Sequence, residues 1–332
     1  MAVCRVYLST YRRNTLLPRA LGSLLQQTFR DWVCELHNDD PHDPFPSEHA
    51  AARGDPRITV VNHARNYGPV GSFNLFFKRI EEPFFSLLED DNWWEPEFLE
   101  TMVAAMRKHP EVQVAWSNMR VWEEQGDGSW RDTGSTLWNA EEGDSKLFQW
   151  PQPRQLSGAL HSNGSMLARG DYDYPPVPPD IDFAAIEPFR ERTFRHPLLL
   201  VSRPLANFSI TRTSARGERQ AEWTHAVTAL TGTYLATVPQ SDDGLRSVWR
   251  EARNGARSTH TLFLAAAHFA ECRRLLRFAS LSDWLWTAAY SVRHPRLTMR
   301  VLSLLKAKQT QSDFLLRYTR ELQQRTYRLS PS

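Results

Sequence analysis

The most constraining feature of the sequence is a short apolar run that stops at three consecutive acids. The run over residues 84–88 has the length of a buried strand, and it is followed directly by Glu89, Asp90 and Asp91. Carboxylate oxygens suit Mg²⁺ and Mn²⁺, and both ions commonly bridge a protein carboxylate to phosphates. We therefore expect a metal site at this strand end. The alternative is a solvated acidic turn in front of a helix predicted over 97–108.

Strands and helices alternate along the first third of the chain. Apolar, β-branched runs predict strands over 2–9, 32–37, 57–61, 84–88 and 112–117. Helical spacing of apolar residues predicts helices over 15–27, from about 71 to 79, and over 97–108. A Pro- and Ala-rich connection is expected between the second and third strands. This alternation is typical of an α/β protein with a doubly wound, mostly parallel sheet flanked by helices.

Polar segments follow three of the predicted strands. They are the loop at Thr10, residues 38–43 and residues 89–92. In doubly wound sheets, ligands bind beyond the carboxyl ends of the strands, which share one edge. This convergence favours the metal site over the solvated turn.

Further elements are predicted after residue 118. A hairpin over 120–133 turns at 126–128, and a strand follows the polar segment 161–165. A helix is expected to open at Asp180 or Asp182 and to run to about Arg192, and 211–220 is a candidate mobile loop.

The C-terminal region differs from the rest in charge and pattern. Residues 244–332 hold 16 Lys and Arg against 5 Asp and Glu, a net +11, which leaves −9 for residues 1–243. Leu262, Phe269 and Leu276 recur at seven-residue spacing in one apolar stripe, and further helices follow. We expect a catalytic domain over 1–243 and a basic helical extension over 244–332. The extension either packs as a bundle or on a second copy, or it lies on a membrane surface.

Cysteine content and hydropathy indicate the cellular compartment in which the protein is expected. The three cysteines are odd in number and scattered, which argues against a disulfide framework or a cysteine zinc site. No apolar run is long enough to cross a membrane. The expectation is a cytoplasmic protein, with peripheral contact at the inner face of the membrane as an alternative.

Several blocks of sequence together resemble family 2 glycosyltransferases of the GT-A fold. They are Ser-Thr-Tyr-Arg-Arg at 9–13, the Leu-Pro-x-x-Leu-x-Ser run with Gln-Thr at 17–29, Asn38-Asp39, Arg65-Asn66-Tyr67-Gly68 with Asn74, and 88–99 with its Trp-x-Pro. The likeness covers residues 3–118 well and 155–193 loosely.

The resemblance implies an inverting, hexosyltransferase-type enzyme. It would move a sugar from a nucleotide diphosphate donor, most often a UDP-sugar, to an acceptor hydroxyl with help from Mn²⁺ or Mg²⁺. The metal would offset charge that grows on the leaving diphosphate.

The resemblance also assigns roles to individual residues. Asp91 matches the metal-binding acid, and Glu89 stands where the family usually has the first Asp of its Asp-x-Asp signature. The nucleotide would contact Thr10, Tyr11, Arg13, Asp39, Asn66, Gly68 and Asp90. His161, Asn163 and Gly164 match sugar or acceptor contacts. Asn92 replaces a frequent fourth acid.

Inversion requires a base that takes the proton of the acceptor hydroxyl. The family places this acid in a Glu-Asp pair at the start of a helix, where this chain has Asp180-Ile181-Asp182. Asp180 aligns best and Asp182 is second, while helix capping is the structural alternative for both.

Two other functions compete with glycosyl transfer. Nucleotidyl transfer is disfavoured because the loop at 9–14 lacks glycine. A catalytically degenerate protein that binds a nucleotide sugar as a scaffold is the main alternative, because of Glu89, Asn92 and the incomplete acid pair. The acceptor would be a glycan, a lipid-linked glycan, a protein or a small molecule, and nucleic acid is not expected as a partner.

Overall fold

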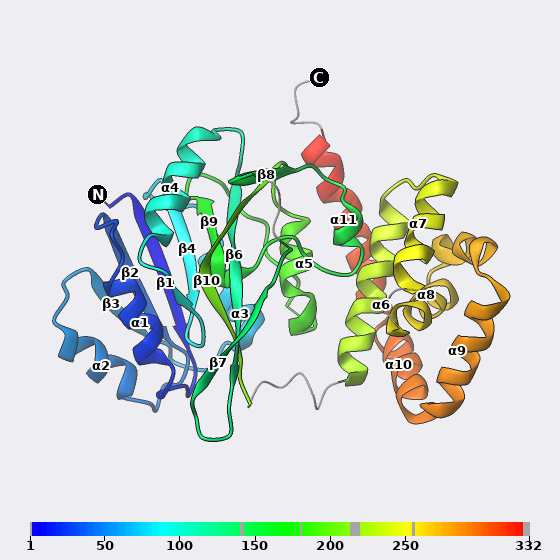
Figure 1. Ribbon diagram of the computed structural model, residues 1–332, viewed down its shortest axis with the longest axis horizontal. Helices are drawn as coiled ribbons and strands as arrows, with labels where there is room; N and C mark the ends of the chain where they lie inside the picture. The colour runs from blue at the N-terminus through cyan, green and yellow to red at the C-terminus, as the bar shows by residue number, and fades with distance from the viewer. Residues whose placement is uncertain (1, 140–142, 180, 213–219, 254–255, 328–332) are drawn as a thin grey trace. The chain divides into compact units, whose positions relative to one another are not determined.

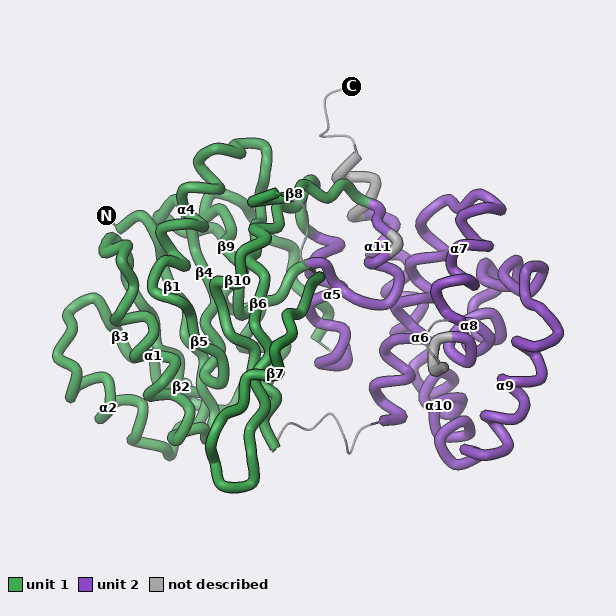
Figure 2. The backbone as a smooth tube through the Cα atoms, viewed as in Figure 1, with its two compact units in different colours: residues 1–150, 161–179, 194–214 green, residues 151–160, 180–193, 215–332 purple. Residues whose placement is uncertain are grey.

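A computed structural model describes residues 2–327 except 140–142, 180, 213–219 and 254–255 (Figure 1). These residues form two compact units, drawn in Figure 2. Unit 1 comprises 1–150, 161–179 and 194–214, and unit 2 comprises 151–160, 180–193 and 215–332. The expected domains, 1–243 and 244–332, stay a prediction. Asp180 and most of the expected mobile loop over 211–220 lie outside the described residues.

Unit 1 contains every strand of the described chain. Its strands are β1 (Cys4–Thr10), β2 (Trp32–Asn38), β3 (Ile58–Asn62), β4 (Phe84–Glu89), β5 (Trp93–Trp94), β6 (Val114–Glu124), β7 (Trp130–Thr136), β8 (Ser145–Phe148), β9 (Met166–Arg169) and β10 (Leu198–Ile210). Its helices are α1 (Leu17–Leu25), α2 (Phe45–Arg53), α3 (Gly68–Phe76), α4 (Phe98–Lys108) and the 3₁₀ turn η2 (Asn163–Ser165).

The strands form one mixed sheet in the order β3-β2-β1-β4-β9-β6-β10-β5, with β7 on β6 and β8 on β10. Strands β3, β2, β1 and β4 are parallel, whereas β9 is antiparallel to both β4 and β6. Thr10 pairs with Asn38, Asn38 with Asn62, and Ser9 with Glu89. The carboxyl ends of these four strands therefore lie side by side, as the sequence predicted.

In unit 1, the connection predicted after β2 is wrong, and the hairpin predicted after residue 120 is correct. The Pro- and Ala-rich connection after β2 contains helix α2. Pro is tolerated in a first helical turn, and Gly54, at φ 62°, ends the helix in the left-handed conformation. The hairpin expected after residue 120 is present, since β6 pairs with β7 in antiparallel fashion.

Unit 2 is helical, as expected for the C-terminal extension. It contains η1 (Pro153–Leu156), η3 (Phe183–Ala185), α5 (Ile186–Glu191), α6 (Gln220–Thr237), α7 (Asp242–Arg253), α8 (Ala256–His268), η4 (Ala270–Phe278), α9 (Leu281–Arg293), α10 (Pro295–Ala307) and α11 (Gln309–Tyr327). The seven-residue stripe through Leu262 does not follow one helix, because α8 ends and the chain is extended at Phe269. None of the described helices has the length and apolar character needed to cross a membrane.

Two helical glycines give a matched test of packing. A Cβ on Gly232 of α6 would overlap the ring of Phe269, whereas a Cβ on Gly22 of α1 would meet nothing within 4 Å. We expect Gly232→Ala to lower the free energy of unfolding by about 1–3 kcal/mol. Gly22→Ala should raise it by about 0.5–1 kcal/mol, because alanine has the higher helix propensity. Thermal unfolding measures both, and equal effects of the two changes would contradict the packing at Phe269.

Candidate nucleotide site

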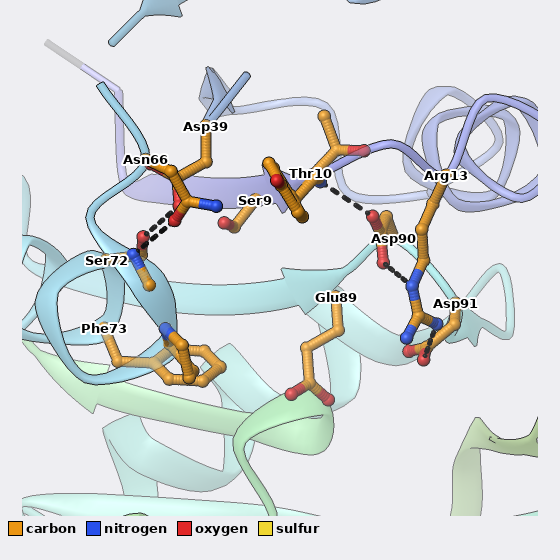
Figure 3. A pocket seen from close by; sticks show the side chains of 13 residues that line it. Ser9, Thr10, Arg13, Asp39, Asn66, Ser72, Phe73, Glu89, Asp90 and Asp91 are labelled. Atoms are coloured by element: carbon orange, nitrogen blue, oxygen red, sulfur yellow. Dashed lines mark hydrogen bonds and ion pairs between the residues drawn. The ribbon is translucent and has the colours of Figure 1, made fainter. Parts of the chain in front are cut away.

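A cavity of about 370 Å³ opens where β1, β2 and β4 end. The residues assigned from sequence to the nucleotide and the metal all line it: Thr10, Tyr11, Arg13, Asp39, Asn66, Gly68, Glu89, Asp90 and Asp91. Ser9, Pro69, Ser72 and Phe73, which sequence analysis missed, line it as well. Figure 3 shows two polar groups, with Asp39, Asn66 and Ser72 on one side and Arg13, Asp90 and Asp91 on the other.

Arg13 neutralises the acidic turn that follows β4. Its Nη1 lies 2.5 Å from Oδ2 of Asp91, and its Nε lies 4.0 Å from Oδ1 of Asp90. The backbone N–H of Tyr11 donates to Oδ2 of Asp90 at 3.4 Å. Between these two donors, Arg12 adopts a left-handed conformation with φ 55°, which is uncommon for a residue other than glycine. The loop after β1 is thus shaped to direct two donors at the acids after β4.

Arg19 of α1 holds the same turn from outside the cavity lining. Its Nη2 donates to the carbonyl oxygen of Asp91 at 2.8 Å and to Oγ of Ser209 at 3.0 Å. Its Cζ lies 3.8 Å and 4.1 Å from the ring centroids of Trp93 and Trp130, an attractive cation–π geometry. Burial lowers the pKa of Arg19 to about 10, so it stays cationic at neutral pH. Sequence analysis missed it, although a cation in a first helical turn opposes the helix dipole and was a usable signal.

Asn92 fixes the remaining acid of the turn. Its Nδ2 donates to Oε2 of Glu89 at 2.6 Å, and its Oδ1 accepts the N–H of Ser209 at 3.0 Å. A Cβ at Gly164 would lie 2.7 Å from the Asn92 amide and 2.9 Å from the Glu89 carboxylate. The carbonyl of Gly164 accepts the indole N–H of Trp94 at 2.8 Å. Only glycine allows this segment to approach Glu89 so closely.

Asp90 has an unusual charge balance. Burial and, after it, the adjacent Asp91 raise the pKa of Asp90 to about 7, although Arg13 and the Tyr11 N–H oppose the shift. The carboxyl group therefore changes charge near neutral pH when the cavity holds no ligand.

Asp39 forms the polar group on the other side of the cavity. The buried carboxylate accepts from the backbone N–H of Tyr67 at 2.9 Å, from Nδ1 of His63 at 2.9 Å and from Oγ of Ser72 at 3.2 Å. These donors come from the segment after β3 and from α3, so helix α3 is tied directly to the end of β2.

A chain of buried hydrogen bonds continues from Asp39 along the sheet. His63 Nε2 lies 2.9 Å from Nδ1 of His37, and His37 Nε2 lies 3.1 Å from Oε2 of Glu35. The two imidazoles thus link Asp39 to Glu35 through hydrogen bonds whose donors depend on the tautomer of each ring. Sequence analysis missed this chain, although both histidines stand at the carboxyl ends of neighbouring strands.

Asn66 and Gly68 shape the start of α3. The Asn66 side chain accepts the N–H of Gly68 at 2.6 Å, which closes a local turn. Gly68 has a φ of 68°, and nothing lies within 4 Å of the position of its missing Cβ. Its backbone conformation, more than crowding by protein atoms, requires glycine here.

The fit to a divalent metal rests on two carboxylates. The described residues hold no cluster of three or more His, Cys, Asp or Glu side chains that could bind a metal ion. Asp91 and Glu89 offer oxygen ligands of the expected kind, but Asp91 is paired with Arg13 and Glu89 accepts from Asn92. In Figure 3 the Glu89 carboxylate points away from the Arg13–Asp91 pair. The donor type fits Mn²⁺ or Mg²⁺, and substrate phosphates would have to complete the coordination.

The other predicted site residues that the structure describes are not among those lining the cavity. His161 and Asn163 are buried, and His161 packs against Phe194 with ring centroids 5.1 Å apart. In unit 2, Oδ2 of Asp182 accepts from Nδ1 of His225 at 3.0 Å and from Nζ of Lys308 at 3.2 Å. Burial opposes ionisation of Asp182, but these two donors outweigh it and lower the pKa. The Asp182 side chain makes no capping bond to the following turn, so helix capping does not explain it.

Comparison with known proteins identifies related sequences. Residues 6–162 match the family described as Glycosyl transferase family 2. WcaA of Escherichia coli (strain K12), named as a glycosyl transferase of colanic acid biosynthesis, is 26% identical over 100 residues. That alignment covers 30% of this chain and 36% of WcaA, so the chain matches about a third of that relative.

Solved structures of low sequence identity share the fold. S. aureus TarS 1–349 in complex with UDP-GlcNAc matches with a TM-score of 0.54 and 13% identity, over 97% of this chain and 91% of that chain. S. aureus TarS matches with a TM-score of 0.55 and 12% identity, over 96% of this chain and 55% of that chain. The likeness supports the expected α/β fold with its helical C-terminal extension.

The raised pKa of Asp90 predicts a pH-dependent stability. Between about pH 4 and 7 the folded protein retains a proton that the unfolded chain has lost, so the free energy of unfolding falls as the pH rises through this window. Asp90→Asn should remove this loss and stabilise the ligand-free protein at pH 8 by roughly 1–3 kcal/mol. Denaturant unfolding at pH 5 and pH 8 measures it. Asp173→Asn, at an exposed acid, is the control, and an Asp90→Asn protein no more stable than this control at pH 8 would refute the argument.

Proposed function

The chain carries a glycosyl transferase family 2 domain over residues 6–162, and we propose that it is an inverting, metal-dependent glycosyltransferase. It moves a sugar from a nucleotide diphosphate donor to an acceptor hydroxyl. A UDP-sugar is the favoured donor, in keeping with the complexes of TarS with UDP-GlcNAc and with UDP.

The observation that carries the proposal is the convergence of three strand ends on one cavity. β1 supplies Arg13 from its following loop, β2 supplies Asp39, and β4 supplies Asp91. An anionic and a cationic group stand together on one side, which suits a metal-bound diphosphate. A hydrogen-bonding carboxylate stands on the other side, which suits a nucleoside.

Each side has a distinct task in this mechanism. Asp39 is held by three donors and accepts a further N–H from the base, while Thr10, Tyr11, Asn66 and Gly68 enclose the nucleoside. Arg13 is the cation of the cavity lining that can turn from Asp91 to a phosphate oxygen. Asp90 accepts the backbone N–H of Tyr11 and keeps the loop after β1 closed on the turn.

Asp91, with Glu89, would hold Mn²⁺ or Mg²⁺. The bound ion supplies positive charge against the leaving diphosphate. Arg19 carries no substrate in this scheme; it fixes the backbone of the turn so that the Asp91 carboxylate keeps its direction.

A carboxylate of the segment 180–182 is the proposed base. The acceptor oxygen attacks the anomeric carbon, the bond from that carbon to the diphosphate oxygen breaks, and the acceptor proton passes to the carboxylate. Asp180 is favoured from sequence. Asp182 is ionised and oriented by His225 and Lys308.

A catalytically degenerate, nucleotide-sugar-binding protein is the alternative. The pairing of Arg13 with Asp91 favours it, because the proposed metal ligand already has a cationic partner. Turnover separates the two functions, since nucleotide binding is expected of both.

Nucleotide binding is the first test. Thermal unfolding with UDP, GDP, dTDP or CDP, each with and without Mn²⁺, should show one nucleotide that raises the melting temperature only with metal. At a hundredfold excess over the dissociation constant, binding stabilises the fold by about 2.7 kcal/mol. Asp91→Asn should abolish the metal-dependent shift and turnover, whereas Asp173→Asn should keep both. A metal-dependent shift that persists in Asp91→Asn would refute the ligand assignment.

Substitution of each acid in 180–182 identifies the base. If Asp180 is the base, Asp180→Asn lowers kcat by about 10²–10⁴ and leaves donor binding intact. Asp182→Asn then lowers the melting temperature, because His225 and Lys308 lose the carboxylate that accepts their hydrogen bonds, and turnover per folded molecule stays normal. The reverse result assigns the base to Asp182. Normal turnover in both variants would exclude this segment.

A further inference from the structure

Helix α9 turns an apolar face to solvent. This α9 face consists of Leu281, Trp284, Leu285, Ala288, Ala289 and Val292, all of which are exposed. Its four large side chains are 75%, 48%, 63% and 80% exposed, in chain order. The positions follow the three- and four-residue spacing of one side of a helix, so the stripe is continuous. A contiguous exposed apolar stripe of this kind marks an interaction surface, whereas scattered exposed apolar residues do not.

The opposite side of α9 explains why this face points outward. Asp283 is buried, accepts from Ser280 at the start of the helix, and pairs with Arg253 of α7 at 2.8 Å. The rings of Trp286 and Tyr290 stack with centroids 5.1 Å apart, and both residues are partly covered. In the observed orientation the Asp283 carboxylate reaches its donors on Ser280 and Arg253, and a helix turned the other way would not make these contacts.

Basic residues follow the α9 face along the chain, and two of them, Arg300 and Lys308, pair with Glu222 and Asp182. From residue 284 to 312 the chain has no Asp or Glu, and it carries Arg293, Arg296, Arg300, Lys306 and Lys308. Arg293 and Arg296 are exposed and make no ion pair with any described residue. Met299 of α10, 63% exposed, lies between two of these arginines in the sequence. The exposed face is therefore apolar, and the exposed residues that follow it in the chain include the unpaired cations Arg293 and Arg296.

We propose that the α9 face, with Arg293 and Arg296, docks onto the surface of an anionic lipid bilayer. The helix would lie in the plane of the interface, with its apolar residues among the upper acyl chains and its arginines at the headgroups. Its 13 residues are too few to cross a bilayer, which needs about 20. Trp284, beside the apolar residues, is of the type enriched at membrane interfaces.

A second copy of the chain fits this surface less well. A two-fold dimer places the same patch on both sides of the interface, which would bring Arg293 and Arg296 of both copies into one interface. Unpaired like charges in an interface disfavour association. The inference uses residues of unit 2 alone and does not rest on the proposed glycosyl transfer.

Vesicle co-sedimentation of the full chain tests the proposal. Vesicles of phosphatidylcholine with about 30% phosphatidylglycerol should bind the protein at low salt, while vesicles of phosphatidylcholine alone should not. Binding should weaken at high salt, because surface charge is screened. Arg293→Gln with Arg296→Gln should weaken binding about 30-fold, and Leu285→Gln with Val292→Gln should also weaken it. Arg79→Gln and Leu137→Gln, exposed changes in unit 1, are the matched controls.

Other outcomes would overturn the proposal. In one such outcome the protein does not bind anionic vesicles, and light scattering shows a dimer that forms with rising protein concentration. If Leu285→Gln with Val292→Gln abolishes this dimer, the α9 face binds a second copy of the chain. Equal binding of wild type and all α9 variants would place the lipid contact elsewhere. Thermal unfolding of the variants is the folding control, and the arginine pair, which is exposed and unpaired, provides a change that leaves the helix packing intact.

Discussion

Consecutive carboxylates at the end of a buried strand need cations and hydrogen-bond donors around them, because an unpaired buried charge is strongly unfavourable. Around the turn after β4, Arg13 neutralises the side chains while Arg19 and Ser209 bind the backbone of Asp91. These partners come from the loop after β1, from α1 and from β10. The acidic turn thus determines how three separate elements meet. The two tryptophan rings around Arg19 extend this dependence to β5 and β7.

The opposite side of the cavity solves a similar problem with histidine instead of arginine. Asp39 is buried at the end of β2, and hydrogen bonds through His63 and His37 connect it to Glu35 along the sheet. Arg5 then pairs with Glu35 and, at 2.6 Å, with Glu82. These contacts fix the orientation of the Asp39 carboxylate at the end of the chain, beside the cavity. On one side of the cavity, the guanidinium of Arg13, which lines the open space, holds the acidic turn. On the other side, a network of hydrogen bonds holds Asp39.

The sequence predicted what depends on strand order and failed where distant side chains meet. The lining from Thr10 to Asp91 followed from parallel strands, whose carboxyl ends must share an edge. The partners of Asp182 could not be predicted in this way, because His225 and Lys308 lie 43 and 126 residues away in the sequence. Helix α2 was missed for a local reason, since prolines at its start resemble a connection although a first helical turn tolerates them.

Helix α9 shows a further limit of pattern analysis. An amphipathic spacing has the same period whichever side of the helix faces the core, so the apolar stripe by itself predicts burial of Leu285 and Val292. The structure reverses this, because Asp283 is fixed at the helix start by Ser280 and reaches Arg253 only when its own side is turned inward. The helix therefore makes the ion pair between buried Asp283 and half-exposed Arg253 and leaves the apolar stripe outside. A helix oriented in this way leaves apolar area exposed at a free-energy cost that a lipid surface would remove.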